Sequence, residues 1–151
     1  MPLPPKLPLI THCLHLLDTS IAEIKQQMQE LVTHAANDSK SSAGDKHETG
    51  RAMMQQAQEQ LGKQVQEAEM KRASLARMLT LPASETIGEG SLVVTHENTL
   101  LLGTPIGKVT FEGMDVFVIS MQSPLAQALK GKKAGDSIVF QQKTIQLLDV
   151  Q

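Results

Sequence analysis

The chain has 151 residues, and its 14 Lys and Arg residues against 16 Asp and Glu residues give it a formal net charge of −2. A chain of this length forms one ordinary domain or two small ones. Its near-neutral charge excludes a general affinity for nucleic acids or anionic membranes, so any nucleic-acid role would act through a protein partner or a local patch. Trp and Tyr are absent and Phe occurs only three times, which argues against an aromatic surface for stacking single-stranded bases.

No apolar run approaches the length of a membrane span, and residues 1–8 lack the apolar core of a signal peptide. We therefore expect a cytoplasmic protein that does not interact with membranes. Cys13 is the single cysteine, which excludes an internal disulfide. Its position beside Leu14 and Leu17 predicts a packed thiol rather than a nucleophile.

The first part of the chain carries an apolar heptad seam, in which spacings of 4 and 3 alternate without a break. Such a seam predicts an amphipathic helix of about 28 residues that pairs with a second helix. Pro8 precedes the seam, at a place compatible with the start of a helix. The seam consists of Ile10, Leu14, Leu17, Ile21, Ile24, Met28, Leu31 and Ala35.

A second helix is predicted over residues 48–79, with a less regular seam that contains two consecutive spacings of four. The turn-forming residues 37–44 are expected to end the first helix and reverse the chain. Because this loop lies midway between matched helices, it favours an antiparallel coiled-coil hairpin within one monomer over a parallel dimer. The second seam consists of Met54, Ala57, Leu61, Val65, Ala68, Leu75 and Leu79, interrupted by Arg72.

After Pro82 the pattern changes to short strands with turn residues between them. Glu112-Gly113 is a plausible hairpin turn. A short helix is predicted from the N-cap Ser123 and the first-turn Pro124 to Gly131. The fold class is therefore α+β, with a helical hairpin in residues 1–80 and a small, mostly antiparallel β domain in residues 81–151. The strands are predicted at residues 91–95, 99–102, 108–111, 114–119, 137–140 and 144–148.

Two carboxylates three residues apart, Asp45 and Glu48, lie at the tip of the predicted hairpin, near residues 38–48. An Asp N-cap followed by Glu at the third helical position is a capping box, which would simply begin the second helix. The same pair suits Mg²⁺, which takes one or two carboxylates together with water and phosphate oxygens. Two carboxylates hold the ion only weakly alone, so a partner would have to supply the remaining ligands.

The other candidate sites are weaker. His12 and His15 have no carboxylate or cysteine that would complete a zinc site, which indicates surface histidines. Lys130, Lys132 and Lys133 form a modest basic spot, which we expect to be a solvated turn.

Two segments resemble the bacterial Gre transcript-cleavage factors. Gly44-Asp45-Lys46-His47-Glu48 resembles the Gly-Asp-Leu-x-Glu-Asn pattern at the tip of that family's hairpin. Residues 123–132, Ser-Pro-Leu-Ala-Gln-Ala-Leu-Lys-Gly-Lys, resemble its Ser-Pro-Ile-Ala-x-x-Leu-x-Gly-Lys segment. Residues 41–51 are most similar to a divergent Gre-like subgroup whose tip reads Ser-Ser-Ala-Gly-Asp-Lys-x-Glu-Thr-Gly-Arg.

The resemblance implies an FKBP-like C-terminal domain that binds RNA polymerase at the rim of its secondary channel, which the hairpin enters. Asp45 and Glu48 would then help to hold a second Mg²⁺, shared with the polymerase, and to position a water. The polymerase would hydrolyse the 3′ end of a backtracked transcript. Ser123 and Pro124 match the segment that contacts the polymerase. The chain would be no enzyme itself but an accessory to the polymerase.

Lys46 stands where the family has Leu, and Thr49-Gly50 replaces Asn-Ala. The positive charge of Lys46 beside the carboxylates weakens cation binding. It thereby favours an alternative, a non-catalytic regulator or inhibitor in the secondary channel. The regular first seam favours another alternative, a coiled-coil scaffold or oligomerisation protein.

Overall fold

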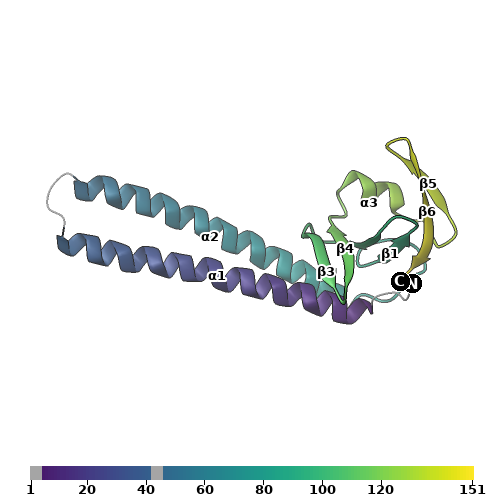
Figure 1. Cartoon of the computed structure of the whole chain (residues 1–151), viewed down its shortest axis with the longest axis horizontal. Coiled ribbons are helices and arrows are strands. Elements are labelled where there is room, and N and C mark those ends of the chain that lie inside the picture. The colour runs from purple at the N-terminus through teal and green to yellow at the C-terminus, as the bar shows by residue number, and fades with distance from the viewer. Residues whose placement is uncertain (1–4, 42–45) are drawn as a thin grey trace. The chain divides into compact units, whose positions relative to one another are not determined.

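The computed structural model describes residues 5–41 and 46–151, without the side chains of residues 35, 37–41 and 46–48. Two long helices precede six strands, and a short helix lies between the fourth and fifth strands (Figure 1). In chain order the elements are α1 (Lys6–Ser41), α2 (Lys46–Met78), β1 (Leu92–Thr95), β2 (Thr99–Leu102), β3 (Gly107–Phe111), β4 (Met114–Ile119), α3 (Pro124–Leu129), β5 (Ser137–Phe140) and β6 (Lys143–Val150).

The chain forms two compact units. One is Leu16–Met70, the greater part of the two long helices. The other combines Met1–His15 with Lys71–Gln151, so the remaining ends of both helices are grouped with the sheet. The division therefore runs across the helices, whereas the predicted domains meet at residue 80.

Helix α1 is longer than predicted at both ends. It begins at Lys6, and the N–H of Leu9 donates its first bond to the carbonyl oxygen of Pro5, at 3.1 Å. Pro8 therefore lies inside the first turn, where backbone N–H groups have no helical partner and a proline costs little. The helix ends at Ser41, within the turn-forming residues 37–44 that were expected to end it, but its 36 residues exceed the expected length of about 28. Asn, Asp and Ser each disfavour a helix by only about half a kcal/mol, and the first Gly or Pro after Pro8 is Gly44.

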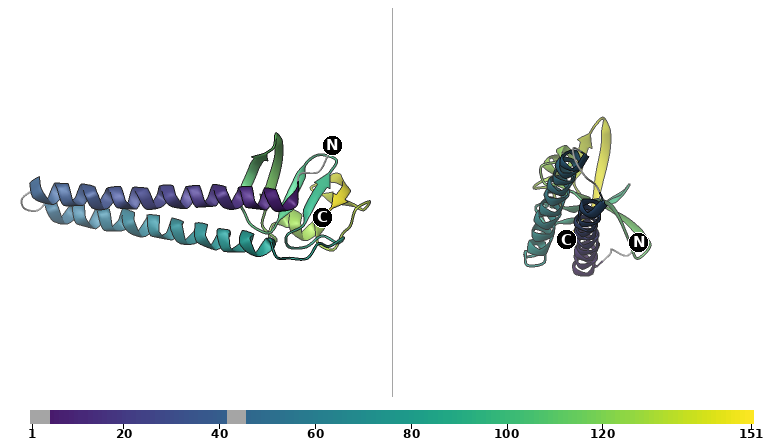
Figure 2. Two further views of the ribbon diagram at one scale, coloured as in Figure 1. Left: turned by 90° about the horizontal axis from the view of Figure 1, so that it is seen from below. Right: turned by 90° about the vertical axis from the view of Figure 1, so that its left-hand side faces the viewer.

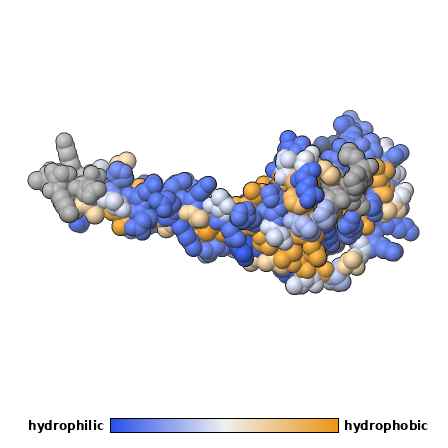
Figure 3. Space-filling model, turned by 60° about the horizontal axis from the view of Figure 1, so that its bottom comes forward, coloured by the Kyte–Doolittle hydropathy of each residue, from blue (hydrophilic) through white to orange (hydrophobic). Residues whose placement is uncertain are grey.

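The middle parts of α1 and α2 lie side by side as an antiparallel pair in all views (Figures 1 and 2), which confirms the predicted chain reversal. The seam positions of α1 from Ile10 to Leu31 are all buried or half-buried. The side-chain amide of Gln58 donates to the carbonyl oxygen of Met28 across the pair, at 2.9 Å. The face of the two helices seen in Figure 3 is mostly hydrophilic. The apolar seam of α1 is thus covered by α2 of the same chain.

The seam of α2 ends differently from the prediction. Ala68 and Leu75 are buried as expected, but Met78 is fully buried and Leu79 is exposed. The assignment of Leu79 to the seam is therefore wrong. Helix α2 ends at Met78, three residues after Leu75, so this methionine takes the last inward-facing position.

The six strands form one sheet in the order β3-β4-β2-β1-β6-β5. All neighbours are antiparallel except β2 and β4, which run parallel with Leu100 opposite Phe117. The predicted strands are confirmed, although β6 extends over Lys143–Val150. Glu112 and Gly113 have φ values of 51° and 78°, which confirms the tight hairpin turn between β3 and β4.

Each face of the sheet carries buried side chains. On one face Val93, Leu100 and Leu102 pack with Ala126 and Leu129 of α3. On the other face the buried residues are Leu92, Leu101 and Val116. At the adjoining ends of α1 and α2, the apolar residues Leu9, Ile10 and Leu75 are buried as well.

Two contacts connect these helix ends to the sheet. The Thr104 hydroxyl donates to that of Ser74, at 3.0 Å. The rings of His12 and Phe111 lie 5.2 Å apart between centroids. The confirmed architecture is a helical hairpin followed by a mostly antiparallel sheet with one short helix.

Candidate functional site

The predicted metal-assisting pair is only partly within the described structure. Asp45 lies outside the described residues, and Glu48 is the third residue of α2, with a side chain that is not described. Helix α2 begins at Lys46, the residue that follows Asp45 in the sequence. A helix N-terminus carries a partial positive charge that favours carboxylates. The capping box and the metal-assisting role of these two residues both stay predictions.

No group of three or more His, Cys, Asp or Glu side chains that could hold a metal ion occurs among the described residues. The zinc site that His12 and His15 would begin is thus not completed within the described part of the chain. If Mg²⁺ binds through Asp45 and Glu48, further oxygen ligands have to come from water or from a partner, because the ion prefers six.

Ser123 and Pro124, the predicted polymerase contacts, begin α3. Ser123 is the N-cap, with extended backbone angles, and its hydroxyl oxygen accepts from the Ala126 N–H at 3.2 Å. The same hydroxyl donates to the carbonyl oxygen of Ser120, at 2.7 Å. Pro124 occupies the first helical turn and is exposed. Ser123 therefore fixes the start of α3, and Pro124 presents its ring to solvent.

One side of α3 faces solvent. Pro124, Gln127 and Lys130 are exposed at a spacing of three residues, while Ala126 and Leu129 are buried on the opposite side. Gly131 follows with a φ of 82°, which a residue with a side chain rarely adopts, and ends the helix. The predicted N-cap, first-turn proline and closing glycine are thus confirmed.

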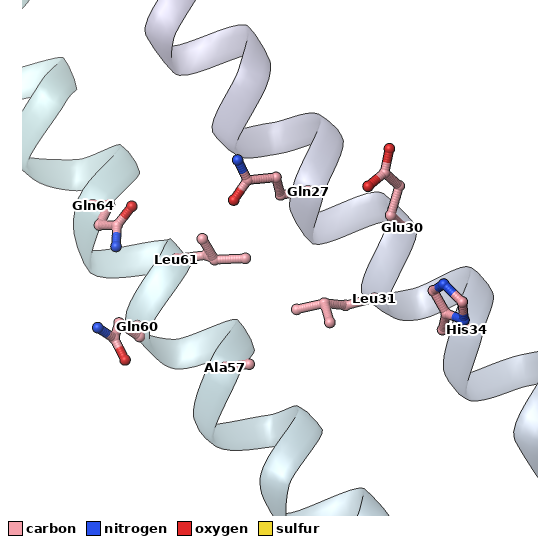
Figure 4. A pocket seen from close by; sticks show the side chains of 8 residues that line it. All are labelled: Gln27, Glu30, Leu31, His34, Ala57, Gln60, Leu61 and Gln64. Carbon is pink, nitrogen blue, oxygen red and sulfur yellow. The ribbon is translucent and has the colours of Figure 1, made fainter.

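A groove of about 420 Å³ opens between α1 and α2 within the hairpin unit (Figure 4). Leu31, Ala57 and Leu61 form its apolar floor. Its rim is polar and consists of Gln27, Glu30, His34, Gln60 and Gln64. Sequence reasoning missed this groove, although the stutter at Ala57, Leu61 and Val65 marks where the two seams lose their match. Its lining contains no paired catalytic groups, so we treat it as a packing gap.

Two described groups have shifted pKa values. Burial raises the pKa of the Cys13 thiol to about 11, and Cys13 is fully buried. This confirms the predicted packed thiol and disfavours a nucleophile, since the thiolate is the reactive form. Burial also lowers the pKa of Lys6. No helix among the described residues has the length and hydropathy needed to cross a bilayer.

No family model matches the chain, and no curated protein matches it. A solved structure of the transcription factor Gfh1 is similar over 91% of this chain and 92% of that chain. The two are 20% identical, with a TM-score of 0.35.

Proposed function

We propose that this chain is a Gre-like transcription elongation factor that binds RNA polymerase. The observation that carries the proposal is where the two Gre-like motifs lie in the fold. The acidic tip motif spans the junction between two paired long helices, and the Ser-Pro segment begins the solvent-facing helix of the sheet unit. Helix α2 has 33 residues, which corresponds to roughly 50 Å at 1.5 Å per residue. A rigid element of that length suits insertion into a channel.

In this proposal the sheet unit docks at the rim of the polymerase's secondary channel, with Pro124 in the contact and Ser123 positioning it. The hairpin carries Asp45 and Glu48 towards the 3′ end of a backtracked transcript. Mg²⁺ held there jointly with the polymerase would supply charge stabilisation for the attacking and leaving oxygens. The carboxylates of this chain would orient the ion and a water. The chain has no activity alone and acts as a monomer in the cytoplasm.

The packing of the hairpin supports a monomer. A parallel dimer or scaffold would need the apolar seams of α1 and α2 to face a second chain. The seams instead face each other, and Gln58 bonds to Met28 across them. The scaffold alternative is therefore the less favoured one.

The test is RNA cleavage in a stalled, backtracked elongation complex to which the purified chain is added. The wild type should accelerate cleavage in the presence of Mg²⁺. Asp45→Asn and Glu48→Gln, which remove charge but keep side-chain size, should lower the cleavage rate by at least about tenfold while polymerase binding persists. Glu59→Gln is a matched control, because Glu59 is exposed on α2 away from the tip.

Lys46, which lies between Asp45 and Glu48 in the sequence, favours a second function, that of a non-catalytic regulator. A regulator that only occupies the channel would bind polymerase and inhibit synthesis, and it would tolerate loss of Asp45 and Glu48. The variant Lys46→Leu separates the two functions. A cleavage factor should become more active at low Mg²⁺ when the competing charge is removed, whereas a blocking regulator should show no cleavage in either form.

A further inference from the structure

Three lysines occupy the turn that follows α3. Lys130 is the C-cap residue, and Lys132 and Lys133 follow the closing Gly131. All three are exposed, and within the described part of the chain none of their ammonium groups forms an ion pair. The other lysines of the sheet, Lys108 and Lys143, each have a carboxylate partner, at 3.5 and 3.7 Å. The turn thus gathers three lysines without an ion pair among the described residues, in contrast to the paired Lys108 and Lys143.

The backbone of this turn is fixed by hydrogen bonds to a distant segment. The Gly131 N–H donates to the carbonyl oxygen of Ile87, and the Ile87 N–H donates back to that of Lys132, both at 2.8 Å. Thr86 and Lys133 form an antiparallel bridge. The lysines therefore project from a rigid backbone, which reduces the entropy lost when a partner binds.

The acidic residue nearest to the lysines in sequence, Asp136, forms hydrogen bonds with the backbone of the turn. An Asp136 side-chain oxygen accepts from the Lys133 N–H, at 3.0 Å, and the Asp136 N–H donates to the Lys133 carbonyl oxygen, at 3.1 Å. Glu85, next to the bridging Thr86, is the other acidic residue of the two paired segments. These two paired segments thus contain three lysines and two acidic residues, and one of the acidic side chains forms a backbone hydrogen bond.

The lysine turn continues the exposed side of α3. We define the α3–lysine surface as Pro124, Gln127, Lys130, Lys132 and Lys133, all of which are exposed. One end of this surface is uncharged and the other is cationic. Charge complementarity therefore favours a partner with acidic side chains opposite the lysine end.

We propose that the α3–lysine surface binds an acidic segment of a protein partner. This inference rests on the proposed function, in which that partner is RNA polymerase, and adds that the polymerase element seated on α3 is acidic. A protein suits the surface better than a nucleic acid. Three lysines in one compact turn do not form the track of phosphate contacts that nucleic-acid binding needs, and the whole chain has a net charge of −2.

The experiment measures the affinity of the end-labelled full chain for core RNA polymerase by fluorescence anisotropy. The test variant is Lys132→Gln/Lys133→Gln. The control variant Lys108→Gln/Lys143→Gln changes the net charge equally, at lysines elsewhere on the sheet. The test variant should bind about tenfold more weakly at low salt, and the control should stay within about twofold of the wild type. The wild-type affinity should also fall more steeply with salt than that of the test variant.

Each outcome supports or overturns a specific statement. If the wild type does not bind polymerase, both the proposed function and this inference fail. If the wild type binds and the two double variants are equally affected, the α3–lysine surface has no special role, and the proposed function stands without it. If the test variant loses affinity for free duplex DNA or single-stranded RNA but keeps its affinity for polymerase, the ligand is a nucleic acid and the inference is wrong.

Discussion

The side chain of Met78 fills the space where Gly103 would carry a β-carbon. A β-carbon built at Gly103 would lie 2.7 Å from the Met78 sulfur and 3.2 Å from its terminal methyl carbon. Met78 is the last residue of α2 and is fully buried, and Gly103 follows β2. The end of the hairpin and the sheet thus pack so closely here that an added β-carbon would displace the end of the Met78 side chain.

We therefore expect Gly103→Ala to lower the free energy of unfolding by about 2–4 kcal/mol, because the end of the Met78 side chain must shift within a packed core and alanine is strained at the φ of 154°. Urea unfolding followed by circular dichroism measures the loss. Gly107→Ala is the control, since Gly107 also has a positive φ, 96°, but no atom within 4 Å of the added β-carbon. It should cost only about 1–2 kcal/mol of backbone strain.

The clash can be separated from the backbone effect with a second substitution. In the double variant Gly103→Ala/Met78→Ala the total loss should be smaller than the sum of the two single losses, because the truncated side chain no longer meets the new β-carbon. Strictly additive losses would mean that the two residues do not interact.

A second prediction concerns the groove between α1 and α2. Ala57→Leu places three further carbon atoms against Leu31 and Leu61, and should raise the stability of the hairpin by about 1 kcal/mol through added apolar burial. Thermal unfolding followed by helical circular dichroism tests this. Ala52→Leu, at an exposed position of α2, should give no gain. Equal gains at both positions would show that the groove is not the cause.

Local sequence signals predicted the elements better than the way in which they meet. Glu112-Gly113 was recognisable as a hairpin turn because it contains a glycine, and Ser123 with Pro124 marked the start of α3. The turn between β5 and β6 was not recognised, because Gln141 and Gln142 adopt φ values of 50° and 65° without a glycine or asparagine. Backbone strain of this kind is imposed by strand pairing and leaves no local signal.

The candidate site likewise combines local features, which the sequence predicts, with non-local contacts, which it does not. The helix cap at Ser123 and the closing Gly131 are local features, and both were predictable. The anchoring of the lysine turn depends on Ile87, more than 40 residues away in the sequence. The parallel pairing of β2 with β4 is equally non-local. Such contacts depend on the register of the whole sheet, which residue periodicity does not specify.

The strained turn at Gln141 and Gln142 gives a third prediction. Replacing the pair by Asn-Gly, the sequence that a two-residue turn with two positive φ values prefers, should stabilise the chain by about 1 kcal/mol. Denaturant unfolding measures the change. Gln141→Ala/Gln142→Ala removes the same side chains but keeps a β-carbon at both positions, so it should give no gain. A gain in the alanine variant would assign the effect to the glutamine side chains.

The buried thiol of Cys13 gives a prediction about pH. Burial raises the pKa of Cys13 from 9.0 to about 11 in the folded chain. The protonated thiol is thus favoured by folding, and its contribution to stability is complete below about pH 9 and is lost as the pH rises towards 11. The stability advantage of the wild type over Cys13→Ala should therefore shrink between about pH 9 and pH 11. An advantage that is constant over this range would contradict the raised pKa.

The same burial protects the thiol from reagents. Alkylation by iodoacetamide at about pH 8 should be at least a hundredfold slower in the native chain than in urea, because both access and thiolate formation are suppressed. Mass spectrometry of the modified chain measures both rates. Rapid native modification would show that the helix end carrying Cys13 opens frequently.

The last prediction separates two roles for Ser123. Its hydroxyl accepts from the Ala126 N–H and donates to the Ser120 carbonyl oxygen, so Ser123→Ala should lower the free energy of unfolding by about 1 kcal/mol, and Ser123→Thr should restore it. If Ser123 acts by positioning α3, polymerase affinity should follow stability across these variants. Pro124→Ala, which leaves the cap in place, should weaken binding with little loss of stability. If Ser123→Thr restores stability but not binding, the serine contacts the partner directly, and the cap alone does not explain its role.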